Sequence, residues 1–343
     1  MTTGDTRHPL KIAVSGIPRG YRFPRADGNW LREGHREQIL GVSPRIQLVE
    51  IPAHQVKETE GIEVLLAEGG NRIHYPGELD RKDYEAFFTP SLKWVQICST
   101  GFSDNITRAI IDGHVTLTNS PDLHTVPIAE SVLAAMLDHA KNLAQRRIDQ
   151  RAHAWRRLDN DELNGSTVLI IGLGNIGKAL ARLCKAFGMT VVGTKHRIGP
   201  VENVDTVFAT NELIDHLPAA DYVVIAAPHT PETENMLDES AFAAMKPSAY
   251  LVNVGRGQII DEPALIAALE EHRIAGAYLD AFDQEPLDDE HVIWNMDNVL
   301  VVPHDSHSSP YIGDRVVDMF CGNLRRYVAG QRLRSICDPV KGY

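Results

Sequence analysis

The sequence has no apolar run of the 18 or more residues that a membrane-spanning helix needs. Residues 1–9 are polar and lack the apolar core of a secretion signal. We therefore expect a cytoplasmic protein that has no membrane partner.

Metal-binding spacings are missing as well. The four cysteines, Cys98, Cys184, Cys321 and Cys337, form no CxxC pair and no Cys/His zinc pattern. We expect reduced thiols and no metal site.

Positive charge is also scarce, because the chain has 34 Lys and Arg against 46 Asp and Glu, for a formal net charge of −12. This balance argues against a nucleic-acid partner but not against small anions, which respond to local charge.

What the 343 residues do contain is an alternation of short β-rich runs with helical runs, over a length typical of two domains. The strands of the second series are apolar on both faces, as in a buried parallel sheet. A last helix over 310–328 is expected to return to the first domain. The predicted strands are 11–14, 64–67, 94–98 and 115–118 in the first series, and 167–171, 190–193, 222–227, 250–254, 275–279 and 299–302 in the second.

A glycine loop runs from Gly172 to Gly177, between an apolar strand and a helix. In that context the pattern predicts a dinucleotide site. Gly172 permits a tight turn, Gly174 lets a pyrophosphate approach the backbone, and Gly177 allows close packing of helix on strand. The free N–H groups at the helix N-terminus then face the phosphates.

The end of the next strand indicates the type of cofactor. NAD-binding proteins usually place Asp or Glu there to hold the ribose 2′-hydroxyl. This chain has Thr194, Lys195, His196 and Arg197 instead. Lys195 and Arg197 would attract a 2′-phosphate and Thr194 could donate a hydrogen bond to it. We predict NADP rather than NAD; the alternative is that these are solvated surface charges.

Three reactive side chains follow strands of the second series. Reducing a 2-oxo acid requires a cation for the carboxylate, an acid for the carbonyl oxygen and a group that orients this acid. Arg256 suits the first role because its planar fork matches a carboxylate. His304 suits the second because its charge changes near neutrality. Glu285 suits the third.

These motifs resemble the D-isomer-specific 2-hydroxyacid dehydrogenase family, in its glyoxylate/hydroxypyruvate reductase-like branch. The resemblance covers 120–305 in order and is weaker before that. It implies two doubly wound α/β domains with a cleft between them. A flavodoxin-like substrate domain would comprise 1–119 and 307–343, and a Rossmann cofactor domain 120–306. The matching segments are 172–177, 228–233, 245–247, 253–257, 261–262, 279–286 and 294–304, with 92–94, 99–101 and 129–130 in the first domain.

The resemblance also implies roles. Arg256 would bind and polarise the substrate, His304 would be the general acid and base, and Glu285 would pair with His304. The backbone at Thr100 and Gly101 would hold the carboxylate, and Asp280 would face the nicotinamide amide. The full set of expected cofactor-binding residues is Gly172, Gly174, Asn175, Ile176, Gly177, Thr194, Lys195, His196, Arg197, Pro228, Thr233, Val254 and Asp280.

Two segments depart from the family pattern. The loop 100–105 has one residue more before Asp104 and Asn105 than many relatives have, so substrate specificity cannot be transferred from them. His307 stands where a small residue is commoner. It either reaches the substrate or points to solvent at a hinge.

The leading hypothesis is thus an NADPH-dependent reductase of small 2-oxo acids such as glyoxylate or hydroxypyruvate. One alternative is an NAD-linked dehydrogenase of another D-2-hydroxy acid. Another is a non-catalytic protein that senses a dinucleotide, against which the three reactive residues argue. Because relatives are commonly dimers, we expect a homodimer. The helix over 128–143 would supply its interface, unless its apolar face is intrachain core.

Overall fold

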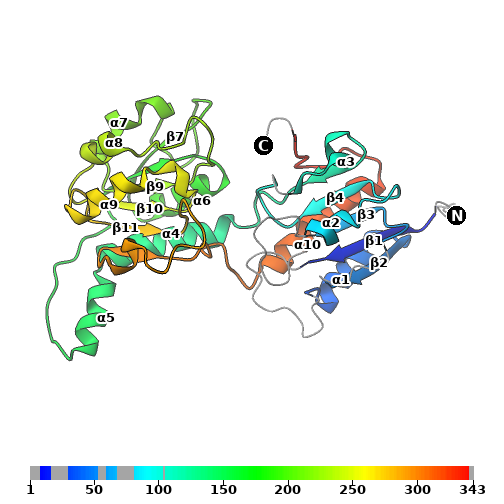
Figure 1. The fold of residues 1–343 in the computed structure, drawn as a ribbon, viewed down its shortest axis with the longest axis horizontal. Helices are drawn as coiled ribbons and strands as arrows, with labels where there is room; N and C mark the ends of the chain where they lie inside the picture. Colours follow the sequence, from blue (N-terminus) through cyan, green and yellow to red (C-terminus); the bar gives the residue numbers. More distant parts are fainter. Residues whose placement is uncertain (1–7, 17–29, 53–58, 68–80, 103–104, 340–343) are drawn as a thin grey trace. The chain divides into compact units, whose positions relative to one another are not determined.

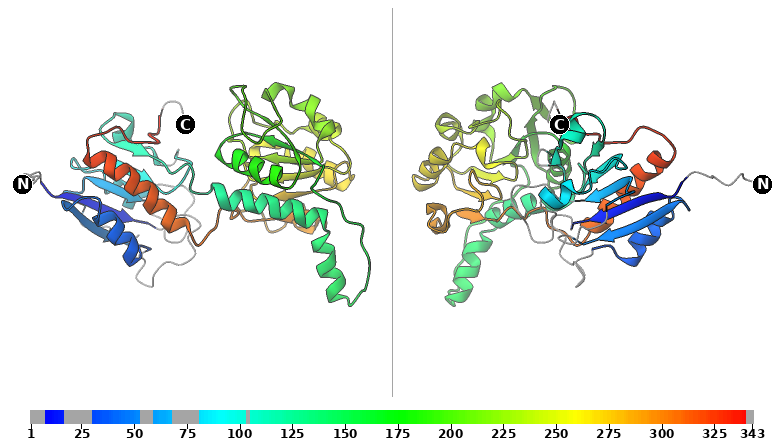
Figure 2. Two further views of the ribbon diagram at one scale, coloured as in Figure 1. Left: turned by 180° about the vertical axis from the view of Figure 1, so that it is seen from behind. Right: turned by 45° about the vertical axis from the view of Figure 1, so that its right-hand side comes forward.

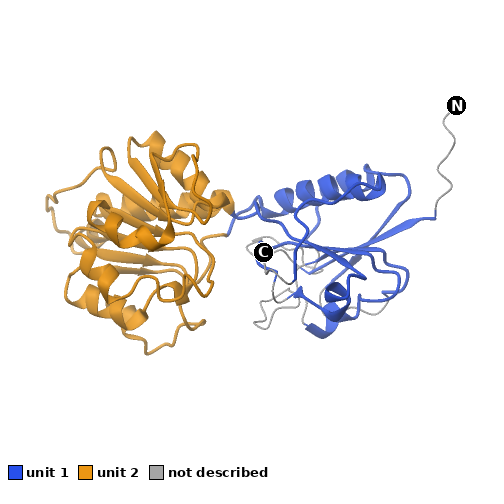
Figure 3. Cartoon of the chain, turned by 90° about the horizontal axis from the view of Figure 1, so that it is seen from above, with its two compact units in different colours: residues 1–124, 308–343 blue, residues 125–307 orange. Residues whose placement is uncertain are grey.

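The structure is a computed structural model that describes residues 8–16, 30–52, 59–67, 81–102 and 105–339. The chain divides into two compact units (Figure 3). Unit 1 comprises residues 1–124 and 308–343, and unit 2 comprises 125–307. In the described ranges, no helix combines the length and apolar character required to cross a bilayer.

Unit 1 is built on a parallel five-stranded sheet of order β2-β1-β3-β4-β5. This is the strand order of flavodoxin-like doubly wound sheets, so the fold prediction for this unit is confirmed. The strands are β1 (Leu10–Ser15), β2 (Ile46–Ile51), β3 (Val64–Ala67), β4 (Trp94–Ile97) and β5 (Thr116–Thr118).

Helices pack on both faces of this sheet. The last of them, α10, crosses one face (Figures 1 and 2) and belongs to unit 1. Phe320 of α10 stacks on Trp94 of β4 with ring centroids 5.2 Å apart, inside a buried apolar cluster. The helices are α1 (Glu33–Leu40), α2 (Arg81–Glu85), α3 (Arg108–Ile111) and α10 (Ile312–Val328).

Unit 2 contains a parallel seven-stranded sheet of order β12-β11-β10-β9-β6-β7-β8. The order reverses between β6 and β9, which is the switch point where α/β sheets bind ligands. The predicted Rossmann-type sheet is confirmed. Its strands are β6 (Thr167–Ile171), β7 (Thr190–Thr194), β8 (Thr206–Phe208), β9 (Tyr222–Ile225), β10 (Tyr250–Asn253), β11 (Gly276–Leu279) and β12 (Val299–Val301).

The central strands of unit 2 bury both faces. Along β6, Val168 and Ile170 pack with α4 and α6, whereas Leu169 and Ile171 pack with α8 and α9. This explains why the strands read as continuous apolar runs. The helices are α4 (Thr125–Ala140), α5 (Leu143–Arg151), α6 (Asn175–Ala186), α7 (Leu213–His216), α8 (Glu239–Ala244) and α9 (Glu262–Glu270), with 3-10 turns at Thr210–Glu212, Leu217–Ala219, Gly257–Ile259 and Val292–Asn295.

The helix expected over 128–143 is in fact two helices. Asn142 has a left-handed backbone, with φ of 53°, between α4 and α5. On α4, Val132 and Met136 are fully buried in the unit 2 core, so the apolar face that could have been an interface is intrachain core. Helix α5 and the loop after it stand away from the rest of the unit (Figure 2).

Edge strands β2 and β8 were not predicted. Strand β2 carries Gln47 and Glu50 among its apolar residues, and β8 has only three residues. An edge strand exposes part of its surface and does not need the continuous apolar run used to find the others. The four cysteines are all buried as free thiols, and burial raises the pKa of Cys184 to about 12.

Candidate active site

The glycine loop joins β6 to α6 at the switch point of the sheet. Gly172 has a φ of +100°, and a Cβ there would lie 2.8 Å from the backbone of Ala227. A Cβ on Gly177 would lie 2.2 Å from the carbonyl oxygen of Gly172. A Cβ on Gly174, in contrast, would meet nothing within 4 Å. The loop therefore needs two glycines for its own fold and keeps open space at the third, which fits a pyrophosphate at the α6 N-terminus.

The last residue of β7, Thr194, and the three residues after it differ in exposure. Thr194 is 2% exposed, and its hydroxyl accepts a hydrogen bond of 3.1 Å from the Gly172 N–H. Thr194 thus stabilises the glycine loop through this hydrogen bond, which the sequence did not indicate. His196 and Arg197 are exposed and Lys195 is half-buried. The Arg197 and Lys195 charges are therefore accessible to a solvent-borne phosphate.

Two further loops carry expected cofactor-binding residues. After β9, the Thr233 hydroxyl donates a 2.9 Å hydrogen bond to the carbonyl of Pro228 and accepts one of 2.8 Å from Thr230 N–H. After β10, the Val254 N–H donates to the carbonyl of Ile225. Both loops thus leave the carboxyl edge of the sheet in fixed conformations. Asn175 and Ile176 form the first turn of α6.

Arg256 lies just beyond β10, exposed, in a loop that Asn253 holds. The Asn253 side chain is fully buried; its oxygen accepts from Gly255 N–H, and its amide donates to the carbonyls of Arg256 and Ala281. One amide therefore ties the Arg256 loop to the loop after β11. The sequence motif contained Asn253, but no role for it followed from the motif.

His304 and Glu285 come from different loops and meet in the structure. The Nδ1 atom of His304 lies 2.8 and 3.0 Å from the two carboxylate oxygens of Glu285. Glu285 is held in turn by the Phe282 N–H, 3.1 Å from its Oε1. Because the Glu285 carboxylate accepts a hydrogen bond from Nδ1–H, the Nε2 atom of His304 is the one available for proton transfer.

Neighbouring groups stabilise the negative charge of Glu285. Burial raises the pKa of this carboxyl, but the hydrogen bond and charge of His304 act against it, as do the Phe282 N–H and the Arg256 charge. The balance holds the pKa of Glu285 below its ordinary value. A carboxylate, an imidazole and a guanidinium are therefore electrostatically coupled at one edge of the sheet.

Asp280 follows β11 directly and bonds the turn after His304. Its carboxylate is 3% exposed and accepts hydrogen bonds from Asp305 N–H at 2.9 Å and Ser306 N–H at 3.1 Å, and another from the Ser306 hydroxyl. In the structure Asp280 thus anchors the turn after His304. A contact with a nicotinamide amide stays a prediction.

His307 does not point to solvent. It is 8% exposed, and its ring centroid lies 6.2 Å from that of His304, with the planes at 81°. Of the two alternatives for this residue, a side chain that points to solvent is therefore wrong. His307 lies instead edge-on beside the imidazole of His304.

Thr100 and Gly101, the residues expected to hold the substrate carboxylate, follow β4 in unit 1. The Asn119 side chain donates a 2.7 Å hydrogen bond to the carbonyl of Thr100, and the Ser99 hydroxyl donates one of 2.8 Å to that of Gly101. Both carbonyls are therefore engaged within the loop. Ser103 and Asp104, on which the unusual loop length depends, lie outside the described residues.

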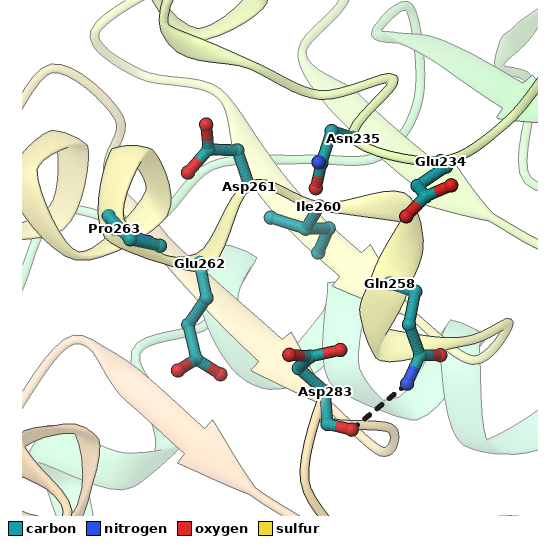
Figure 4. Close-up of a pocket in the computed structure, with 8 residues that line it drawn as sticks. All are labelled: Glu234, Asn235, Gln258, Ile260, Asp261, Glu262, Pro263 and Asp283. Atoms are coloured by element: carbon teal, nitrogen blue, oxygen red, sulfur yellow. Dashed lines mark hydrogen bonds between the residues drawn. The ribbon is translucent and has the colours of Figure 1, made fainter.

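A pocket of about 310 Å³ adjoins the loops after β10 and β11 (Figure 4). Its lining includes four carboxylates and no Lys or Arg. At one side of the pocket, the amide of Gln258 donates a 2.9 Å hydrogen bond to the carbonyl of Asp283. Four negative charges would repel an anionic substrate, so we do not place a 2-oxo acid there. The carboxylates are Glu234, Asp261, Glu262 and Asp283.

A glycine loop at the switch point, with a His–Glu pair and an arginine after neighbouring strands of the same sheet, is typical of a nicotinamide-dependent dehydrogenase. Comparison with known proteins agrees with this class of enzyme. Residues 133–306 match the family model of the D-isomer specific 2-hydroxyacid dehydrogenase, NAD binding domain. The glyoxylate reductase of Pyrococcus furiosus is 30% identical over 298 residues, 84% of each chain. The chain belongs to the D-isomer specific 2-hydroxyacid dehydrogenase family.

Solved structures of the family have the same fold. A family member from Aeromonas salmonicida is 28% identical, with a TM-score of 0.79 over 96% of this chain and 99% of that one. An NADPH-dependent glyoxylate/hydroxypyruvate reductase from Sinorhizobium meliloti, in complex with NADP and sulfate, is 25% identical, with a TM-score of 0.74 over 98% of this chain and 100% of that one. The similarity therefore extends through both units.

Proposed function

We propose that this protein is an NADPH-dependent reductase that converts small 2-oxo acids, such as glyoxylate or hydroxypyruvate, to D-2-hydroxy acids. The observation that carries the proposal is the His304–Glu285 pair at 2.8 Å, placed on the sheet edge that also presents Arg256 and the glycine loop. The reductases from Pyrococcus furiosus and Sinorhizobium meliloti add support by their activities.

In this proposal each reacting side chain has one task. Arg256 binds the substrate carboxylate and polarises the carbonyl, while the backbone of Thr100 and Gly101 holds the carboxylate from unit 1. Bound NADPH supplies the hydride that the carbonyl carbon accepts. The protonated Nε2 of His304 donates its proton to the carbonyl oxygen as the new C–H bond forms. Glu285 keeps the imidazole in the correct orientation and stabilises its positive form.

The choice of NADPH rests on charge. The accessible cations Lys195 and Arg197 follow β7, and no carboxylate stands at the strand end where an NAD enzyme would use one for the 2′-hydroxyl. The phosphate would be held chiefly by these two residues with His196, because Thr194 lies buried under the glycine loop. Supporting this choice, the Sinorhizobium meliloti structure contains NADP.

We also propose that the protein acts in the cytoplasm as a homodimer, and we now place the contact on the region after α4. Ile148 on α5 is 55% exposed and Trp155 in the following loop is 101% exposed. Large apolar side chains that a monomer leaves in water are typical of a surface covered by a partner. Sedimentation of the wild-type chain and of a Trp155→Ser variant tests this contact.

A substrate and cofactor panel tests the function. Purified enzyme is assayed with glyoxylate, hydroxypyruvate, pyruvate and 2-oxobutyrate, each with NADPH and with NADH. We expect the highest kcat/KM with NADPH and a small 2-oxo acid, and we expect chiral chromatography to show the D product whenever the product is chiral. Equal kcat/KM for NADPH and NADH would contradict the cofactor assignment. A His304→Ala variant should lose most turnover and keep NADPH binding, whereas a non-catalytic sensor would show no turnover to lose.

A further inference from the structure

We propose that Ser306 is a positioning residue for the reaction, because its hydroxyl and backbone anchor the turn that holds His304 against Glu285. This inference rests on the proposed function, in which His304 transfers the proton. Ser306 touches neither reacting atom in that scheme and acts through the shape of the turn.

The turn needs an anchor because His304 has an unfavourable backbone. Its φ is +50°, in the left-handed region that side chains other than glycine rarely adopt. Such a conformation persists only where surrounding contacts determine it. Within the turn itself, the His304 N–H bonds the carbonyl of Val302 at 2.9 Å. Glu285 holds the ring of His304, and further contacts that fix the backbone come from the residues after His304.

Ser306 supplies these contacts from every polar atom that it has. Its N–H and its hydroxyl both donate to the buried carboxylate of Asp280, at the end of β11. Its carbonyl accepts a 3.2 Å hydrogen bond from the hydroxyl of Ser131 on α4. The turn is therefore pinned to a strand on one side and to a helix on the other. Ser306 itself is 6% exposed, so water does not offer equivalent partners.

The anchor also orders the ring contacts of His304. His307 follows Ser306 directly, and its ring lies edge-on to that of His304 at 6.2 Å. Glu285 holds Nδ1 on another side. Release of Ser306 would let both the left-handed backbone and this ring packing relax. The Nε2 atom would then spend less time in the position from which it donates its proton.

The charge of Asp280 depends on the same hydroxyl. Burial raises the pKa of Asp280, while the Ser306 hydroxyl and N–H, the His304 charge and the Asp305 N–H lower it. The neighbouring titratable groups are His304 and Asp305 of the turn and Tyr278 of β11. Without the hydroxyl, Asp280 takes up a proton at higher pH, and a protonated Asp280 accepts hydrogen bonds from the turn less strongly.

The experiment compares Ser306→Ala, which removes the hydroxyl, with Ser306→Thr, which keeps it. Ser306→Cys, a weaker donor of similar size, serves if the alanine variant does not fold. Ser240→Ala is the matched control, because Ser240 also donates to a carboxylate, that of Asp238, at the exposed N-terminus of α8. Each variant is assayed for kcat and KM from pH 5 to 9, for NADPH affinity and for thermal unfolding. Hydrogen exchange reports on the amides of Asp305 and Ser306.

We expect kcat of Ser306→Ala to fall about tenfold, since a hydrogen bond to a charged group is lost, while KM and the NADPH Kd change less than twofold. The acid limb of its pH profile should move to higher pH, and both amides should exchange faster. Ser306→Thr should restore at least a third of kcat, and Ser240→Ala should match wild type. Wild-type kcat and pH profile in Ser306→Ala would overturn the inference, as would equal losses in the threonine variant. A wild-type enzyme inactive on every 2-oxo acid would instead overturn the proposed function.

Discussion

Replacement of Glu285 by Gln tests how much the carboxylate contributes to proton transfer. The variant keeps the size of the side chain and an acceptor oxygen but removes the charge that lies 2.8 Å from Nδ1 of His304. Both side chains are about three-quarters buried, with 23% and 24% exposed, so solvent screens the pair only in part. A hydrogen bond to a charged group contributes about 1.5 to 3 kcal/mol. We therefore expect kcat/KM to fall about 10- to 100-fold, because each 1.4 kcal/mol corresponds to about a factor of ten.

The chain offers a matched control for this variant. Glu262 accepts from Nε2 of His291 at 3.1 Å, a second half-buried His–Glu pair in the same unit. Glu262→Gln should keep kcat/KM within about twofold of wild type. The assay is steady-state reduction of glyoxylate followed by NADPH absorbance. Equal losses in the two variants, or wild-type activity in Glu285→Gln, would show that the pairing with His304 does not serve catalysis.

The same pair predicts a pH dependence of stability. The pKa of Glu285 is lower in the folded protein than its ordinary value of 4.5. Its contribution to the free energy of unfolding is therefore fully present above pH 4.5 and is lost as pH falls through the lower, folded pKa. Urea unfolding between pH 3 and 7 should show this component in wild type and not in Glu285→Gln. A parallel pH dependence in both proteins would contradict the assignment.

Further predictions concern other sites. Gly177→Ala should destabilise unit 2 in a thermal melt because of its close approach to backbone, whereas Gly174→Ala should melt normally and weaken NADPH binding in a fluorescence titration. Replacing Lys195 and Arg197 together by Ala should raise KM for NADPH about tenfold or more and leave KM for NADH nearly unchanged, since a charge-assisted contact to phosphate is lost. Burial lowers the pKa of His139 below its ordinary value of 6.5. The wild-type protein should therefore lose stability as pH falls through 6.5, whereas His139→Phe should not. The free energy of unfolding, measured at pH 8 and at pH 5.5 for both proteins, tests this.

Local patterns in the sequence determined much of the fold. The central strands could be found because burial on both faces requires continuous apolar runs, as in β6 with Val168 to Ile171. The glycine loop could be assigned because the surrounding backbone leaves no room for a Cβ at Gly172 and Gly177. The family pattern also indicated the order of units along the chain. Strands β2 and β8 escaped prediction since edge positions place weaker demands on composition.

For the candidate site, the sequence predicted which residues take part but not how their side chains contact one another. The sequence nominated His304, Glu285 and Arg256 by residue type and by position after strands, because parallel strands bring their carboxyl ends to one edge. The resemblance implied that Glu285 pairs with His304. That Nδ1 is the atom that meets the carboxylate, and that Asp280 turns its own carboxylate to the loop at Ser306, depends on side-chain directions and backbone angles. Those are set by contacts between residues 19 to 26 positions apart in the chain, such as Glu285 with His304 and Asp280 with Ser306. No local pattern encodes such contacts, so only the tertiary structure decided them.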